Sequence, residues 1–253
     1  MSARFRDCFL CALFVVSTTF FTTMASADTP RPGIDPRVDR LLRNMSDYLK
    51  STPEFSFRTE VNYDQVLDSG QKILYGRRAE VSMRRPDRLH VIVNGDLFNQ
   101  RIWYDGKTFT LLDLRDLEFI EVSVPPTLDD AMDFMARKYG IASPVSDVLF
   151  SDAYAVFTEN VISGSYIGPA VVRGVPTHHL AFTQLNIDWQ LWIEDGAKPL
   201  PRKAVITYKN VTSAPQFVVW LSDWDVEPHL ADSLFEFMPP DGAKQIEARP
   251  VAP

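Results

Sequence analysis

The side chains that could support metal chemistry are few and scattered along the chain. His178 and His179 are the only adjacent histidines, and neighbouring side chains on a strand point to opposite faces of a sheet. His90 and His229 lie on separate segments, and no spacing typical of zinc ligands occurs. The pattern therefore predicts no metal site.

Motifs for nucleophilic, carboxylate or phosphate chemistry are equally weak. Ser163-Gly164-Ser165 lacks the strand-to-helix context of a nucleophile elbow and is typical of a bend or bulge in a strand. Asp129, Asp130 and Asp133 lie at a predicted helix start, where carboxylates complement the helix dipole. The glycine-containing segments are typical of turns rather than phosphate loops. We expect no catalytic residue, no cofactor and no enzymatic activity.

The composition is that of a globular chain. The 253 residues are 45% hydrophobic, 12% aromatic and 23% charged, with a formal net charge of -7. These proportions exclude a disordered, collagen-like or multi-span membrane protein. The acidic balance argues against nucleic acid as a partner, because phosphate binding requires a basic surface. The only cysteines, Cys8 and Cys11, cannot build a disulfide framework or a zinc site.

The first 27 residues have the pattern of a secretory signal peptide. Two arginines precede an uncharged, largely apolar stretch at 8–21, and Ala25-Ser26-Ala27 forms a small-x-small cleavage site. The apolar stretch is short for a membrane span, and a retained N-terminal anchor is the alternative. We expect cleavage after Ala27 and export to the periplasm of a cysteine-free, monomeric chain of residues 28–253, forming a single domain.

The exported chain begins with one amphipathic helix. Asp35-Pro36 marks its start, as an N-cap followed by proline at the first helical position. Apolar residues then recur at helical spacing, and charged residues fill the opposite side. Such a helix needs a surface on which to bury its apolar stripe. The stripe consists of Val38, Leu41, Leu42, Met45, Tyr48 and Leu49, and the opposite side of Arg37, Asp39, Arg40, Arg43 and Asp47.

Two groups of strands follow, separated by a helical insert at about 127–158. Thr127 is the expected N-cap of the insert's first helix, Gly140 its C-cap, and Asp152 begins the last helix. Short strands joined by hairpins predict an α+β fold: a large curled antiparallel sheet, a half-open barrel of about ten strands, covered by the N-terminal helix and the insert. The expected strands lie around 55–63, 73–83, 89–93, 100–113, 170–173, 178–184, 189–194, 202–209 and 216–225.

The hairpin at 100–113 allows two registers. A two-residue turn at Asp105-Gly106 pairs Tyr104 with Lys107 and Ile102 with Phe109, whereas a three-residue turn pairs Trp103 with Phe109. We favour the first register because it leaves one wetter face, formed by Arg101, Thr108 and Thr110.

The chain is rich in aromatic residues, with five Trp, eight Tyr and seventeen Phe. If the helices cover a curled sheet incompletely, its concave side is an apolar groove suited to acyl chains. The alternative is that these residues simply pack a core.

Five phrases, in this order along the chain, resemble a known superfamily. They are Arg84-Arg85-Pro86-Asp87-Arg88-Leu89, Ile102-Trp103-Tyr104-Asp105-Gly106-Lys107, Trp192-Ile193-Glu194-Asp195, Leu200-Pro201-Arg202-Lys203 and Phe235-Glu236-Phe237-Met238-Pro239-Pro240-Asp241-Gly242-Ala243. The sequence resembles the periplasmic lipoprotein-carrier superfamily of LolA, LolB, LppX and RseB, and is most similar to an uncharacterised periplasmic branch described as a domain of unknown function.

The resemblance implies a cavity for lipid or lipoprotein acyl chains, with helices as a lid and a membrane or envelope protein as a further partner. It also implies an arginine that holds the lid, for which the first helix offers Arg37, Arg40 and Arg43. Met132 and Met135 of the insert are the expected lid contacts. The expected cavity lining is Phe55, Phe57, Ile102, Tyr104, Phe109, Leu111, Trp189, Leu191, Ile193, Phe217 and Val219.

The sequence therefore predicts a non-catalytic carrier or binding protein for acyl chains. The alternative is a regulatory module like RseB, which senses envelope stress through protein contacts. RseB-like proteins carry a second C-terminal domain, and the chain stopping at Pro253 disfavours that interpretation.

Overall fold

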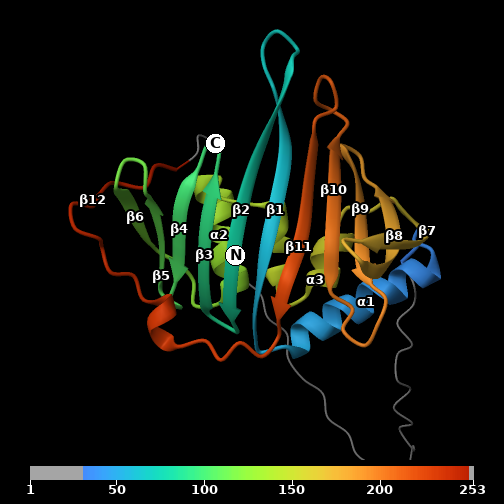
Figure 1. The fold of residues 1–253 in the computed structure, drawn as a ribbon, viewed down its shortest axis with the longest axis horizontal. Helices are drawn as coiled ribbons and strands as arrows, with labels where there is room; N and C mark the ends of the chain where they lie inside the picture. Colours follow the sequence, from blue (N-terminus) through green and yellow to red (C-terminus); the bar gives the residue numbers. More distant parts are fainter. Residues whose placement is uncertain (1–30, 251–253) are drawn as a thin grey trace, which may run out of the picture.

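A sheet of twelve strands forms the framework of residues 31–250, the part of the chain that the computed structural model describes (Figure 1). The predicted signal peptide lies outside the described residues. Neighbouring strands are antiparallel apart from the short parallel pair β12–β6, and their order is β12-β6-β5-β4-β3-β2-β1-β11-β10-β9-β8-β7. The strands are β1 Glu54–Val66, β2 Lys72–Arg84, β3 Arg88–Gly95, β4 Asn99–Tyr104, β5 Thr108–Asp113, β6 Glu118–Ser123, β7 Ser163–Val172, β8 Val175–Thr183, β9 Ile187–Glu194, β10 Pro201–Tyr208, β11 Gln216–Asp225 and β12 Lys244–Gln245.

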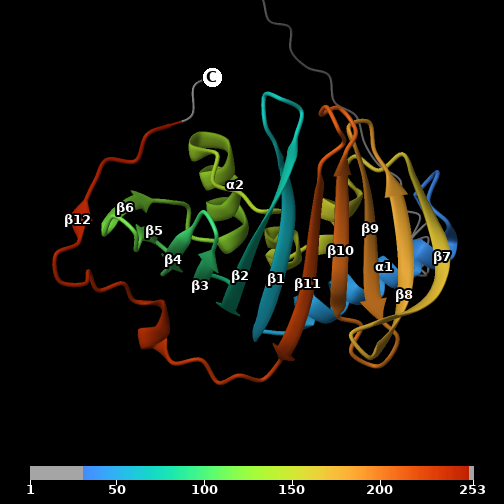
Figure 2. The ribbon, with the colours of Figure 1, turned by 45° about the horizontal axis from the view of Figure 1, so that its top comes forward.

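The sheet consists of two meanders that lie side by side. β1 pairs with β2 on one side and with β11 on the other, so that β1–β6 and β7–β11 form one continuous surface. Figure 2 shows this surface curling into an open trough. The predicted α+β fold with a large curled sheet is therefore confirmed, and β6 and β12 are strands that the sequence did not predict.

The helix α1 (Pro36–Ser51) begins where the sequence predicts. The backbone N–H of Arg37 donates a hydrogen bond to Oδ1 of Asp35 at 2.7 Å, so that the aspartate caps the helix. α1 lies across the trough near the lower ends of β8–β11 (Figures 1 and 2). Its buried apolar stripe packs into the main core through Val38, Leu42, Met45 and Leu49.

The insert between β6 and β7 contains three short helical elements behind the sheet (Figure 1). α2 (Leu128–Tyr139) starts after its predicted cap Thr127 and ends at Gly140, whose φ of 67° suits a glycine. η1 (Pro144–Leu149) and α3 (Ala153–Thr158) follow. The insert thus covers the concave face with segments of only one to three turns.

The β4–β5 hairpin has neither of the expected registers. Tyr104 pairs with Phe109, and Ile102 pairs with Leu111. Asp105 explains the difference, because its Oδ1 accepts hydrogen bonds from the backbone amides two and three residues later, at 2.9 and 2.7 Å. Relative to the favoured register the shift is two residues, so the same side chains still share one face.

The other face of this hairpin is covered rather than wet. Phe237, in the segment after β11, lies over Trp103 and Phe119 with ring centroids 4.9 and 5.0 Å apart. Thr110, expected on a wetter face, is only 2% exposed. That expectation was wrong because alternation within a hairpin cannot reveal a covering segment that is distant in sequence.

Candidate functional site

All thirteen side chains expected as cavity lining or lid belong to one apolar cluster on the concave side. On α2, Met135 is buried and Met132 is half-buried against the cluster; Ile102 and Leu111 are half-buried on the sheet. The structure therefore brings these residues together, and most of them are buried. The buried sheet residues are Phe55, Phe57, Tyr104, Phe109, Trp189, Leu191, Ile193, Phe217 and Val219.

Two aromatic residues that the sequence analysis did not single out extend this apolar surface. Phe182 stacks on Trp189 with 3.9 Å between ring centroids, and the alternation of β8 could have identified it. Trp224 stacks on Phe57 at 4.3 Å. Strict alternation along β11 would place Trp224 on the opposite face. The β1–β11 register shifts near Asp223, whose φ is 51°, and this irregularity brings Trp224 to the concave face.

Arg85 fastens the helical cover to the sheet. It lies in the turn between β2 and β3, and its terminal nitrogens donate hydrogen bonds to three backbone oxygens. These belong to Leu49 at 3.4 Å, in the last turn of α1, and to Leu149 at 3.1 Å and Phe150 at 3.3 Å, at the end of η1. Burial lowers the pKa of Arg85. One side chain thus joins the sheet, α1 and the insert.

A second polar contact joins α1 to α3. Arg43 Nε donates to Asp39 Oδ2 at 2.9 Å, Arg43 Nη2 donates to Tyr154 Oη at 2.9 Å, and the tyrosine hydroxyl also hydrogen-bonds Asp39. Asp39 was expected on the polar side of the helix but is 3% exposed, because α3 covers it. Burial, together with the hydrogen bond to Asp39, raises the pKa of Tyr154 to about 12. Of the three arginines considered on this helix, Arg43 thus joins α1 to α3 through Tyr154.

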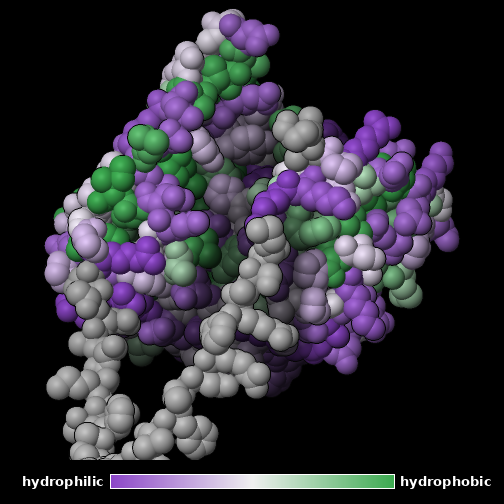
Figure 3. Space-filling view, turned by 180° about the vertical axis from the view of Figure 1, so that it is seen from behind, coloured by the Kyte–Doolittle hydropathy of each residue, from purple (hydrophilic) through white to green (hydrophobic). Residues whose placement is uncertain are grey.

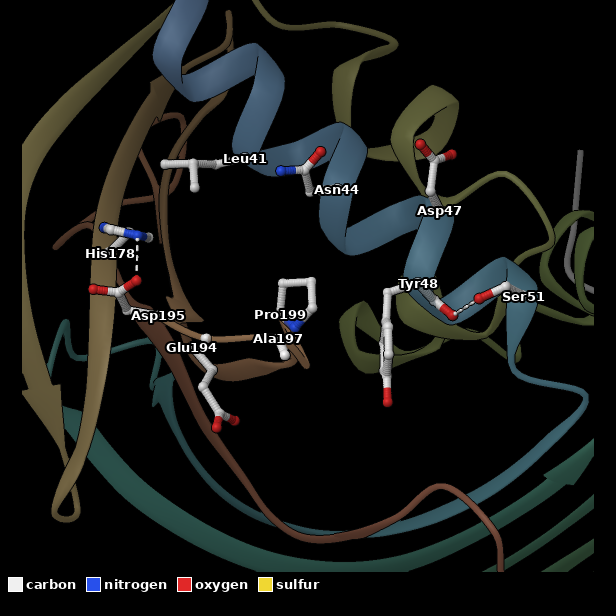
Figure 4. Close-up of a pocket in the computed structure, with 11 residues that line it drawn as sticks. Leu41, Asn44, Asp47, Tyr48, Ser51, His178, Glu194, Asp195, Ala197 and Pro199 are labelled. Atoms are coloured by element: carbon white, nitrogen blue, oxygen red, sulfur yellow. Dashed lines mark hydrogen bonds and ion pairs between the residues drawn. The ribbon is translucent and has the colours of Figure 1, made fainter.

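An open groove of about 660 Å³ lies between α1 and the turn that joins β9 to β10 (Figure 4). The exposed side of α1 and the β9–β10 turn form its two walls. None of the thirteen expected lining or lid residues lines it. The lining residues are Leu41, Asn44, Asp47, Tyr48, Ser51, His178, Glu194, Asp195, Gly196, Ala197 and Pro199.

The groove is mixed in character and mostly acidic in its charges. His178 Nε2 lies 3.2 Å from Asp195, and its Nδ1 lies 3.2 Å from the hydroxyl of Tyr166. Beyond the C-terminal end of α1 a smaller hollow of about 370 Å³ shares Tyr48 and Ser51 with the groove. Figure 3 shows the face that carries the helices, hollowed near its centre between hydrophobic and hydrophilic side chains.

The histidine pair behaves as expected from a strand. His178 points into the groove (Figure 4), whereas His179 stacks on Trp192 on the other face of the sheet, with 4.0 Å between ring centroids. Within residues 31–250, no group of three or more His, Cys, Asp or Glu side chains could hold a metal ion. In the same range, no helix has the length and apolar character needed to cross a membrane.

Several solved structures are similar to this chain. An uncharacterised conserved protein from Thermus thermophilus is 9% identical, with a TM-score of 0.49 over 83% of this chain and 98% of that chain. The lipoprotein LppX of Mycobacterium tuberculosis is 13% identical, with a TM-score of 0.43 over 77% and 97%. A LolA superfamily protein from Nitrosomonas europaea is 14% identical, with a TM-score of 0.38 over 78% and 96%.

No curated protein matches the chain. Residues 38–248 match the family described as "Predicted periplasmic protein (DUF2092)". This match covers most of the chain, and it agrees with the uncharacterised periplasmic branch to which the sequence is most similar. The protein is periplasmic, and the chain belongs to the DUF2092 family.

Proposed function

We propose that this protein is a non-catalytic periplasmic carrier or binding protein, which holds acyl chains of lipids or lipoproteins against the concave face of its sheet. The observation that supports this proposal best is the way in which the helical insert covers the concave face of the sheet. A continuous apolar surface lies beneath an insert of short helices, and a few polar side chains fasten that insert.

The insert is suited to move as a unit. η1 and α3 contain six residues each, and helices of that length are not stable in isolation. Their positions therefore depend on contacts with α1 and on the hydrogen bonds of Arg85 and Tyr154. Displacement of the insert would uncover aromatic and aliphatic side chains that could pack around an acyl chain.

Release of such a ligand requires a partner of similar apolar character. Each methylene buried in the protein contributes about 0.8 kcal/mol, so a chain would leave only for an acceptor that buries it comparably. The half-buried Leu41 and Tyr48 line the groove and also pack against the main core. The groove beside α1 is therefore the proposed route between the interior and the acceptor.

Lipid extraction tests the proposal directly. Protein exported by a bacterial host is purified, extracted and examined by mass spectrometry, and the delipidated protein is titrated with a fluorescent fatty-acid probe. We expect co-purified acyl lipid and saturable probe binding. A protein that co-purifies with no acyl lipid and does not bind the probe would contradict the proposal.

A neighbouring pair of valines supplies a matched comparison. Val219 is buried on the concave face, whereas Val218 lies half-buried on the convex face. Val219→Phe fills part of the interior and is expected to reduce the bound acyl lipid several-fold, while Val218→Phe leaves it unchanged. Because overpacking costs about 1–3 kcal/mol, the melting temperature of both variants is measured alongside.

A protein-binding regulatory role is the second candidate. The groove beside α1 favours it, because a wide surface opening that combines apolar and acidic side chains suits a protein segment. In that case the extracted protein would contain no acyl lipid.

A further inference from the structure

Two buried side-chain nitrogens in the described part of the chain have no hydrogen-bond partner: Nε of Arg85 and Nε1 of Trp189. Both are donors, and no buried side-chain oxygen among the described residues lacks a partner. Buried polar groups are nearly always hydrogen-bonded, because a donor without an acceptor destabilises the fold. Among the fully buried side-chain polar atoms of the described residues, those without a partner are therefore donors.

The surroundings of Trp189 explain why its N–H has no partner. The side chain is 6% exposed, and the ring of Phe182 lies parallel to it at 3.9 Å between centroids. Phe157 of α3 lies 5.7 Å away on a nearly parallel ring. These neighbours offer aromatic faces and no acceptor oxygen. By contrast, Trp224 on the same face donates its N–H to the backbone oxygen of Pro201 at 3.1 Å.

We propose that the Trp189 Nε1–H donates a hydrogen bond to the carbonyl oxygen of a bound acyl group, and so selects O-acyl or N-acyl lipids over hydrocarbons and alkyl ethers. The inference rests on the proposed function and deepens it. A carbonyl oxygen accepts hydrogen bonds without donating any, so it would supply the acceptor that the Trp189 N–H lacks.

The position of Trp189 links the proposed hydrogen bond to the helical insert. Phe157 belongs to α3, whose attachment to α1 runs through Tyr154 in the preceding turn. When α3 moves, Phe157 moves with it, and the indole becomes accessible from the interior. The acyl carbonyl would therefore lie beneath α3, with the hydrocarbon chain running along the concave face.

The test compares two probes that differ only in the carbonyl group: 1-monooleoylglycerol, an ester, and 1-O-oleylglycerol, its ether analogue. Wild-type protein is expected to bind the ester more tightly. Trp189→Phe removes the N–H and keeps an aromatic ring, and should weaken ester binding about tenfold while changing ether binding less than twofold. Trp192→Phe, the same substitution on the convex face, is the control.

A spectroscopic measurement separates a direct contact from a general loss of packing. In protein labelled with 15N-tryptophan, the indole signal missing in Trp189→Phe is that of Trp189. The ester should shift this signal downfield in wild-type protein, and the ether should not. Equal effects of the substitution on both probes, or an unshifted indole signal, would overturn the inference. Failure of wild-type protein to bind either probe would instead overturn the proposed function.

Two competitors identify where the carbonyl comes from. Dioleoyl phosphatidylglycerol supplies it from a phospholipid, and a synthetic diacylated lipopeptide supplies it from a lipoprotein. Displacement of the ester by one competitor, with the Trp189 signal still shifted downfield, supports the inference and names the source. Displacement that reverses the shift, or failure of both competitors to displace the ester, contradicts it.

Discussion

Asp147 shows how one residue can make the stability of this protein depend on pH. Burial on η1 raises the pKa of its carboxyl group from 3.8 to about 7. Between these values the unfolded chain releases a proton that the folded chain keeps, so the free energy of unfolding decreases as pH rises from about 4 to about 7 and then levels off. Asp147→Asn removes this decrease.

We therefore expect Asp147→Asn to be more stable than wild-type protein at pH 8 and to lose this advantage near pH 4. One pKa unit corresponds to about 1.4 kcal/mol, so the gain is about 2–4 kcal/mol, the upper value being reduced by residual solvent contact. Urea unfolding followed by tryptophan fluorescence between pH 4 and pH 8 measures it. Asp116→Asn, in an exposed loop, is the matched control. Parallel stability curves for the two variants would contradict the assignment.

At the residue scale, the sequence predicts which side chains share a face but not which are held by polar contacts. Period-two alternation was sufficient to place Phe55, Leu191 and Val219 together, because a strand fixes where its side chains point. In the sequence analysis Arg85 is named only within a phrase that resembles the lipoprotein-carrier superfamily. Its role depends on three backbone oxygens from two other elements, and no spacing in the sequence encodes that meeting.

At the element scale, helix ends were predictable and strand registers were less so. Asp35, Thr127 and Gly140 act on their own helices, so a local pattern identifies them. The β4–β5 register depends on one side chain, Asp105, that binds the turn backbone. β12 has two residues and pairs with β6 only after the C-terminal segment has crossed the sheet, so periodicity cannot detect it.

The attachment of the insert to the sheet leads to a prediction at this scale. Arg85→Met keeps the aliphatic stem and removes all donors, leaving the oxygens of Leu49, Leu149 and Phe150 without them. We expect the free energy of unfolding to decrease by about 1–3 kcal/mol. Amide exchange in η1 and α3 should accelerate more than in the sheet, and bound fatty-acid probe should dissociate faster.

Arg115→Met is the matched control for this change. Arg115 also donates to a backbone oxygen, that of Leu97, but it lies in the β5–β6 loop far from the insert. It should leave exchange in the insert unchanged. If hydrogen exchange in η1 and α3 is equally unaffected in Arg85→Met, the hydrogen bonds of Arg85 do not hold the insert in place.

At the scale of the whole molecule, many of the large exposed apolar residues lie at one end of the sheet. In an antiparallel meander alternate turns lie at the same end, so the β1–β2, β3–β4, β5–β6, β8–β9 and β10–β11 turns form one rim, with the β1–β2 hairpin projecting farthest (Figure 1). Each of these turns exposes a large apolar side chain on or beside it, while the charged residues within them nearly cancel. The apolar residues are Leu67, Leu74, Phe98, Leu117, Leu185 and Val211.

A carrier that collects acyl chains from a bilayer would contact it through such a rim. We expect the protein to cosediment with phosphatidylcholine vesicles, and to do so almost independently of salt, because the rim offers apolar contact with little net charge.

Leu74 is 65% exposed on the rim, and Ile167 is 57% exposed on the edge strand β7, away from it. Since burying a leucine contributes about 1.5–3 kcal/mol, Leu74→Ser should weaken vesicle binding about tenfold even if insertion is partial. Ile167→Ser removes a comparable exposed side chain and should have little effect. Equal losses in both variants would mean that general surface hydrophobicity, rather than the rim, determines contact with the bilayer.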